Sequence, residues 1–126
     1  METDYAVRIV SALASSGSAL SAAVLAKQTG VSQNFCLKIL RRLSKAGVAA
    51  SIRGVSGGYR LNKKPSDITL REIIEIIEGP IIIARCQCAD YTCDHPGDQS
   101  CYFQSIFENT SREIAEKFGK ITFEQK

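Results

Sequence analysis

The feature that most constrains the fold is a pair of short helical segments separated by a glycine turn. Residues 22–29 predict a helix that ends at Gly30, and Ser32 is a good N-cap for a second helix that continues to Ala46 and stops at Gly47. Two short helices joined by a tight turn that contains glycine are typical of a helix-turn-helix unit. We therefore expect this unit in the first half of the sequence.

The first half of the sequence is basic and opens on another predicted helix. Residues 4–15 carry apolar side chains at helical spacing, with Thr3 or Asp4 available as the N-cap. Residues 1–65 contain ten Lys and Arg against two Asp and Glu, whereas residues 66–126 contain six against eleven. A basic half joined to an acidic half favours a polyanion-binding module attached to a second functional part.

The second helix of the helix-turn-helix unit has an apolar face and a polar face. The apolar residues recur at helical spacing and predict an inward stripe made of Phe35, Cys36, Ile39, Leu40 and Leu43. On the opposite face, amides suit base edges, cations suit phosphates, and an exposed Leu37 suits a thymine methyl group. The candidate DNA-contacting residues on this helix are Gln33, Asn34, Leu37, Lys38, Arg41 and Arg42, with Lys45 on the same face. The alternative is a solvated helix with ordinary surface charges.

A predicted β-hairpin follows this helix. Residues 48–52 and 59–61 predict two short strands, and the glycine-rich residues 54–58 predict the loop between them. Arginines at the base of the loop and on the returning strand suit a DNA groove or the DNA backbone, and the glycines permit close approach to phosphates. The glycines also suit the turn itself, and the two roles do not compete. The hairpin is interpreted as a wing, with candidate contacts at Arg53, Gly54, Ser56, Gly57, Gly58 and Arg60.

The acidic half predicts two further helices. Thr69 and Glu72 form a capping-box pattern at the start of a short isoleucine-rich helix that ends at Gly79. A longer helix is predicted after residue 101, because a stripe recurs every three or four residues at Phe103, Ile106, Phe107, Thr110, Ile114 and Phe118. A small domain leaves little core for so long a helix, so this stripe is expected to need a partner. The alternative is that it packs on its own domain.

Four of the five cysteines lie in the short polar segment 85–101, at Cys86, Cys88, Cys93 and Cys101. No signal peptide is readable at the start of the sequence, and no uninterrupted apolar run approaches the roughly 20 residues that a membrane span needs. We therefore expect a reducing cytoplasm, where clustered cysteines bind metal or sense redox state more often than they form disulfides. The fifth, Cys36, lies on the apolar stripe and is expected to be a small core residue.

Two other kinds of chemistry remain open for this segment. Zinc suits a closed tetrahedral site of thiolates and an imidazole, which Cys86 or Cys88, Cys93, His95 and Cys101 can supply. An enzyme with a reactive cysteine is disfavoured, because the chain has one histidine and no nucleophile, base and orienting residue at recognisable spacing.

These residues together resemble a family of bacterial winged-helix transcriptional regulators that includes IscR, NsrR, RirA and CymR. The resemblance covers nearly the whole chain and rests on four motifs: Thr-Asp-Tyr-Ala-Val-Arg at residues 3–8, Ser-Gln-Asn-Phe at 32–35, Arg-Gly-Val-Ser-Gly-Gly-Tyr at 53–59 and Ile-Thr-Leu-Arg-Glu-Ile-Ile at 68–74. The wing motif followed by the Ile-Thr-Leu helix start is far more specific than a helix-turn-helix alone.

The resemblance implies a mainly α fold with a small β-hairpin wing. A winged helix-turn-helix DNA-binding domain would span residues 1–80, a cysteine-rich cluster-binding loop residues 81–101, and a dimerisation helix with its tail residues 102–126. It also implies a homodimeric transcriptional regulator that binds a palindromic operator in double-stranded DNA and no membrane. Arg53 would enter the minor groove, while the helix that begins at Ser32 would enter the major groove.

The resemblance further implies an iron–sulfur cluster, [2Fe–2S] or [4Fe–4S], that senses redox state, nitric oxide or iron status. Cys86, Cys93 and Cys101 occur in the order in which cluster-binding members carry three ligands, although the C-x6-C-x7-C spacing is wider than in IscR and NsrR. Thiolates suit such clusters, which normally take four protein ligands. Members such as CymR lack a cluster and respond to a protein partner, which is a further alternative.

The fourth ligand is left open between several residues. The histidine that serves IscR is replaced here by Gln104. The aspartate that the other subunit supplies in NsrR matches Asp4, which is therefore favoured as a ligand from the partner subunit. Its alternative role is in capping or charging the first helical turn. Cys88 would instead complete an all-cysteine site within one subunit, and His95 is a weaker candidate.

Overall fold

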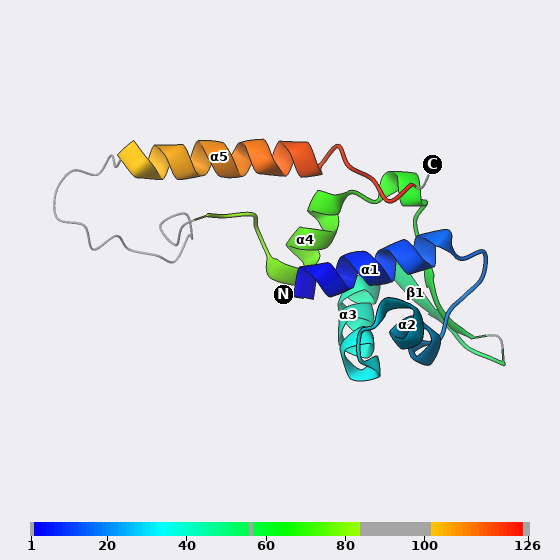
Figure 1. The fold of residues 1–126 in the computed structure, drawn as a ribbon. Coiled ribbons are helices and arrows are strands. Elements are labelled where there is room, and N and C mark those ends of the chain that lie inside the picture. The colour runs from blue at the N-terminus through cyan, green and yellow to red at the C-terminus, as the bar shows by residue number, and fades with distance from the viewer. Residues whose placement is uncertain (1, 56, 84–101, 125–126) are drawn as a thin grey trace.

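The computed structural model describes residues 2–55, 57–83 and 102–124 and has a mainly helical fold with one small sheet (Figure 1). Its elements, in chain order, are α1 (Glu2–Ser15), α2 (Ala22–Thr29), α3 (Gln33–Lys45), β1 (Ala49–Ile52), β2 (Gly58–Leu61), the 3-10 helix η1 (Pro65–Asp67), α4 (Leu70–Glu78) and α5 (Tyr102–Phe118). The predicted fold class, mainly α with a β-hairpin wing, is confirmed. None of the helices in these ranges is long and apolar enough to cross a membrane.

The helix-turn-helix unit forms as predicted, because local signals define both ends of its helices. The Val24 amide donates to Ser21 Oγ at the start of α2, and Gly30 ends this helix in the left-handed region with φ of 76°. The Phe35 amide donates to Ser32 Oγ at 3.3 Å, so the predicted N-cap of α3 is also confirmed. A glycine at a positive φ carries little strain, which permits the tight turn between the helices.

The core lies where α1, α2, α3 and α4 meet, and residues of the hairpin pack against it. Its largest fully buried side chains are Ile9, Val10, Leu25, Cys36, Ile39, Leu40, Leu43, Val48, Ile68 and Ile73. The expected N-caps of α1 are wrong, because α1 already includes Glu2, which places Thr3 and Asp4 inside its first turn. The burial of Cys36 agrees with its predicted core role.

The wing pairs β1 with β2 in antiparallel register, with Ala49 opposite Leu61 and Ile52 opposite Gly58. A third segment joins this sheet: the Leu20 amide donates to the Tyr59 carbonyl at 2.9 Å, and the Tyr59 amide donates to the Leu20 carbonyl at 2.7 Å. This pairing fastens the turn before α2 to the returning strand. It was absent from the sequence-based expectation, since one isolated bridge has no periodic signal.

Gly58 is required by this three-way junction, and Gly58→Ala is expected to destabilise the fold. Its φ is 152°, and a Cβ there would lie 2.5 Å from the Leu20 carbonyl oxygen. We expect a loss of about 1–3 kcal/mol in the free energy of unfolding, measured by urea denaturation. Gly17→Ala is the matched control, because nothing lies within 4 Å of its added Cβ. Equal urea midpoints for the two variants would contradict this prediction.

The short helix α4 begins and ends where the sequence predicts. The Glu72 amide donates to Thr69 Oγ1 at 3.1 Å, and Gly79 follows the last turn with φ of 88°. The capping box is only partly realised, because the Glu72 carboxylate accepts from Lys63 Nζ at 2.9 and 3.1 Å instead. Glu72 therefore pairs with Lys63, which lies close in space, and not with the backbone amide at the start of α4 that the capping-box spacing predicts.

The tail after α5 returns to the winged domain. The Leu70 amide donates to the Ile121 carbonyl at 2.8 Å, and the Phe123 amide donates to the Ile68 carbonyl at 3.1 Å. Phe123 is 7% exposed and belongs to the same core as α1 and α4. The carboxyl end of α5 is therefore anchored, while the rest of this helix extends beside the domain (Figure 1).

Candidate nucleic-acid interface and sensor segment

The outward face of α3 carries the polar groups that the sequence assigned to DNA. Gln33, Asn34, Arg41 and Lys45 are all exposed there. Ser32 is also exposed, and its hydroxyl oxygen accepts from the helix amide already described. Two amide side chains and two long cations therefore share a surface, and none of the four forms a side-chain hydrogen bond within the described ranges. The amides on this surface have the chemistry to contact base edges, and the cations have the chemistry to contact phosphates.

Two apolar residues of α3 differ from their expected positions. Leu37 is half-buried and packs against the core rather than standing free, so its expected exposure was wrong. Phe35 is 40% exposed instead of buried, and its ring contacts the Tyr5 ring edge-on with centroids 5.7 Å apart. The two residues lie at opposite edges of the buried stripe. At such positions helical spacing predicts the face on which a side chain lies but not how much of it is buried.

Two cations of α3 are engaged by Glu2 of α1. Lys38 Nζ lies 2.7 Å from Glu2 Oε1, and Arg42 Nη1 lies 3.3 Å from Glu2 Oε2. Arg42 Nη1 also donates to the Ile77 carbonyl at 2.7 Å, near the end of α4. The hydrogen bond from Lys38, together with the charges of Lys38 and Arg42, holds the pKa of the Glu2 carboxyl below its usual value. Arg42, expected to suit phosphates, therefore links three helices.

The wing tip presents Arg53, Gly54 and Val55 to solvent, and Arg60 is exposed on β2. Gly57 has a structural task, because a Cβ there would meet the Ile52 carbonyl oxygen and lie 2.8 Å from the Gly54 carbonyl oxygen. The amino end of α3 and the wing tip both project from the side of the domain opposite to α5 (Figure 1). Ser56, the remaining wing candidate, lies outside the described residues.

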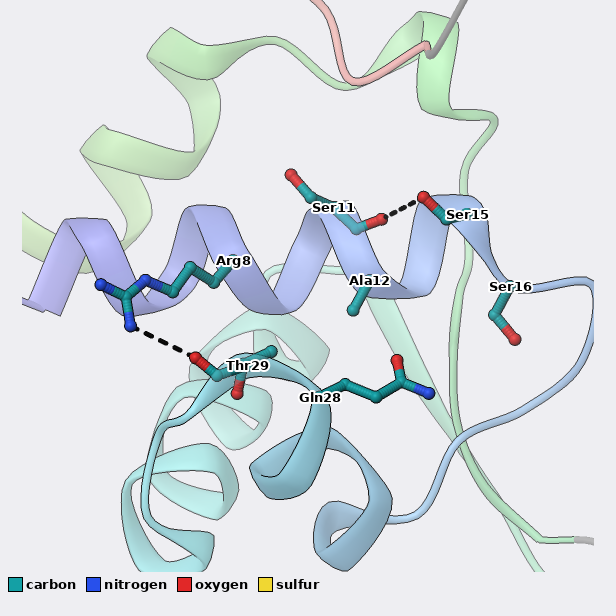
Figure 2. A pocket seen from close by; sticks show the side chains of 7 residues that line it. All are labelled: Arg8, Ser11, Ala12, Ser15, Ser16, Gln28 and Thr29. Atoms are coloured by element: carbon teal, nitrogen blue, oxygen red, sulfur yellow. Dashed lines mark hydrogen bonds between the residues drawn. The ribbon is translucent and has the colours of Figure 1, made fainter.

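Asp4 lies on the surface of the first turn of α1, where its carboxylate forms an ion pair. Arg8 Nη2 lies 2.7 Å from Asp4 Oδ2, and the two side chains are 46% and 61% exposed, respectively. Arg8 Nη1 also donates to the Thr29 carbonyl at the end of α2, at 3.2 Å (Figure 2). This bond borders an open groove of about 520 Å³ lined by Arg8, Ser11, Ala12, Ser15, Ser16, Gln28 and Thr29. Arg8 thus connects Asp4 to the helix-turn-helix unit.

The other proposed ligands belong to the cysteine-rich segment. Cys86, Cys88, Cys93, His95 and Cys101 all lie outside the described residues. Within the ranges that the structure does describe, no group of three or more His, Cys, Asp or Glu could hold a metal ion. Cys36 is buried, and its burial raises the pKa of the thiol, which disfavours the thiolate form needed for metal binding.

Helix α5 exposes large apolar side chains in its first half. Tyr102 is 73% exposed, Phe103 is 62% exposed and Ile106 is 39% exposed. Further along the helix, Ser111 and Ala115 are buried. The predicted stripe is therefore divided, because its second half is partly covered by the domain while its first half is open. An apolar patch of this kind is typical of an interaction surface.

Comparison with known proteins agrees with this arrangement. The sequence matches the Rrf2 family model, described as an iron-dependent transcriptional regulator, over residues 1–125. It is 40% identical over 92 residues to an rrf2-like HTH-type transcriptional regulator of Rhodobacter capsulatus, a match that covers 71% of this chain and 61% of that relative. The chain thus spans about three fifths of the length of that curated relative.

Two solved structures share the fold over almost the whole chain. IscR of T. potens has a TM-score of 0.79 and 26% sequence identity, with 98% of this chain and 80% of that chain covered. CymR, the global cysteine regulator of B. subtilis, has a TM-score of 0.79 and 25% identity, with 98% and 90% covered. The helix-turn-helix unit, the wing and α5 all belong to the shared fold.

Proposed function

Because the chain belongs to the Rrf2 family of iron-dependent transcriptional regulators, we propose that it binds operator DNA as a homodimer and responds to an iron–sulfur cluster. The observation that carries DNA binding is that the amino end of α3 and the wing tip project from one side of the domain, opposite to α5 (Figure 1). A helix for the major groove and a wing for the neighbouring groove need this arrangement.

Within this surface, each candidate has a role that its chemistry permits. The amides of Gln33 and Asn34 contact base edges, and the guanidinium of Arg41 contacts phosphate. Arg53 contacts the minor groove from the wing tip, with Ser32, Gly54, Ser56 and Arg60 adding backbone contacts. Leu37 contributes less than the sequence predicts, because much of its side chain already packs against the core. Gly57 and Gly58 act by shaping the wing.

For the sensor, the donor set fits an iron–sulfur cluster. Four cysteines in one short segment provide the soft thiolates that such a cluster needs, and Cys86, Cys93 and Cys101 are the proposed ligands. Among the described residues, the exposed Asp4 carboxylate is held by one exposed ion pair with Arg8, so it can exchange partners at small cost. When bound, the cluster would supply reversible redox and ligand-binding chemistry.

The consequence for the DNA-binding domain follows from the contacts of Arg8. If Asp4 serves the cluster of the partner subunit, its carboxylate must leave Arg8. The guanidinium, which also donates to the Thr29 carbonyl just before the turn of the helix-turn-helix unit, would then lose the carboxylate that positions it. Occupation of the sensor segment is thereby expected to alter how α1 holds α2, and with it the orientation of α3. The signal is proposed to be redox state, nitric oxide or iron supply.

The direct test of DNA recognition uses Arg41→Gln and Arg53→Gln in the full chain. On an operator selected from a random duplex library, each variant is expected to weaken binding by about 1–3 kcal/mol and to lower the salt dependence, measured by fluorescence anisotropy. Lys120→Gln is the control, since this exposed cation follows α5. Unchanged binding by both arginine variants would reject the proposed surface.

A second candidate is a regulator of the same fold that works without a cluster. The TM-score to CymR equals that to IscR, so the fold does not distinguish the two kinds of sensor. Iron and acid-labile sulfide in anaerobically purified protein favour the cluster. Zinc without sulfide favours a zinc-stabilised DNA-binding module, and no metal favours control by a protein partner.

A further inference from the structure

We propose that Glu2 limits the affinity of this protein for DNA, because it holds Lys38 of the DNA-reading helix in an ion pair that DNA phosphates must displace. The inference rests on the proposed role of α3 in DNA binding. Glu2 lies outside both the candidate DNA-binding surface and the sensor segment. We assign to it a role in the electrostatic part of DNA binding.

The geometry draws the Lys38 ammonium toward α1. Its Nζ lies 2.7 Å from Glu2 Oε1 and 5.7 Å from the centroid of the Phe35 ring. The exposed ring of Phe35, which also contacts the Tyr5 ring of α1, lies near this ammonium. The same ammonium cannot neutralise a DNA phosphate while it keeps this position. DNA binding must therefore break the pair or proceed without Lys38.

Arg42 shows why Lys38 is the cation that responds to Glu2. Arg42 Nη1 contacts Glu2 Oε2 at 3.3 Å, but it also donates to the Ile77 carbonyl at 2.7 Å. Loss of Glu2 leaves Arg42 held by this second, shorter bond. Among the described residues, Lys38 contacts the Glu2 carboxylate and the Phe35 ring, so removal of the carboxylate leaves its ammonium without that ion pair.

The exposure of the pair predicts a moderate effect. Lys38 is 52% exposed and Glu2 is 29% exposed, so water screens part of their attraction. An exposed pair of this kind changes an equilibrium by up to about fivefold. Each additional phosphate neutralised by a cation steepens the dependence of log K on log salt by about 0.9. Release of Lys38 should therefore tighten DNA binding and make it more sensitive to salt.

The test measures binding of the full chain to a random-sequence duplex of about 30 base pairs, because phosphate contacts dominate such binding. Glu2→Gln is expected to bind about two- to fivefold more tightly per protomer at low salt, with a salt slope steeper by about one per protomer. Glu78→Gln is the matched control, since it removes the same charge from an exposed position next to Ile77. Circular dichroism and thermal unfolding confirm that both variants are folded.

Lys38→Gln separates a specific ion pair from a general change of charge. In the Lys38→Gln background, Glu2→Gln should bring no more affinity than Glu78→Gln does. The proposal is overturned if Glu2→Gln still gains more than Glu78→Gln in the Lys38→Gln background, or if the two variants gain equally when Lys38 is present. If Arg41→Gln and Lys38→Gln both leave DNA binding unchanged, the assignment of α3 as the reading helix fails as well. If they weaken binding while Glu2→Gln has no effect, only the role of Glu2 fails.

Discussion

If the proposed homodimer assembles through α5, Ile106→Glu is expected to yield a monomer and to weaken operator binding at least about 100-fold. Ile106 lies between the exposed rings of α5 and the half that the domain partly covers, and it is 39% exposed in the single chain. In a helix-to-helix dimer this side chain becomes buried, so a carboxylate there would be an unpaired charge in an apolar interface. Such a charge costs several kcal/mol unless it finds a partner.

The loss of DNA affinity has a separate physical origin. A dimer binds two half-sites, and the second contact occurs at a high effective concentration, which raises the overall affinity by roughly 10²–10⁴ over that of one domain. A monomer with an intact α3 and wing keeps only the affinity of one half-site. Light scattering after size exclusion gives the oligomeric state, and anisotropy titration with a palindromic duplex gives the affinity.

Ser105→Glu is the control for this experiment. Ser105 is exposed and adjacent to Ile106, but a rotation of about 100° per residue places it on the face of α5 away from the apolar stripe. Ser105→Glu adds the same charge to the same turn and should leave the proposed dimer intact. An Ile106→Glu protein that still behaves as a dimer would show that assembly uses another surface. Equal disruption by both variants would show a general effect of charge.

Local sequence signals were sufficient to predict α2, α3 and α4, although they misplaced the start of α1. Ser21, Ser32 and Thr69 each accept the amide three residues later, and Gly30 and Gly79 follow helices at positive φ. Caps and terminal glycines act within one helical turn, so their effect can be read from a few adjacent residues. The order of the elements and the winged fold followed from these signals and from the resemblance.

The contacts that local signals could not predict join residues far apart in the sequence. The Leu20 to Tyr59 bridge and the packing of Phe123 on the domain have no periodic pattern, because each rests on single backbone pairings. The ion pair between Glu2 and Lys38 spans 36 positions. The sequence therefore predicted which residues belong to the candidate DNA-binding surface. That Lys38 of this surface forms an ion pair with Glu2 of α1 became clear only from the three-dimensional structure.

Cys101→Ser is expected to abolish the proposed iron–sulfur cluster, while Asp4→Ala is expected to alter it. Cys101 is one of three proposed thiolate ligands, and a hydroxyl is a poor replacement for a thiolate at iron. In anaerobically purified protein, iron and sulfide should fall to background in Cys101→Ser. Asp4→Ala should shift the visible and Mössbauer spectra and speed the loss of the cluster in air, because a ligand from the partner subunit is missing.

The fold should be nearly unaffected by Asp4→Ala, which makes the spectra interpretable. Asp4 and Arg8 form an exposed pair one helical turn apart, and such pairs contribute only about 0.3–0.5 kcal/mol to stability. Asp67→Asn removes a carboxylate from another exposed position and should leave the spectra unchanged.

Cys88→Ser tests the rival fourth ligand. If Asp4→Ala has wild-type spectra and Cys88→Ser does not, the site is made of four cysteines within one subunit, and the proposed exchange of Asp4 between Arg8 and the partner does not occur. If both variants keep wild-type spectra, His95 becomes the residue to replace next.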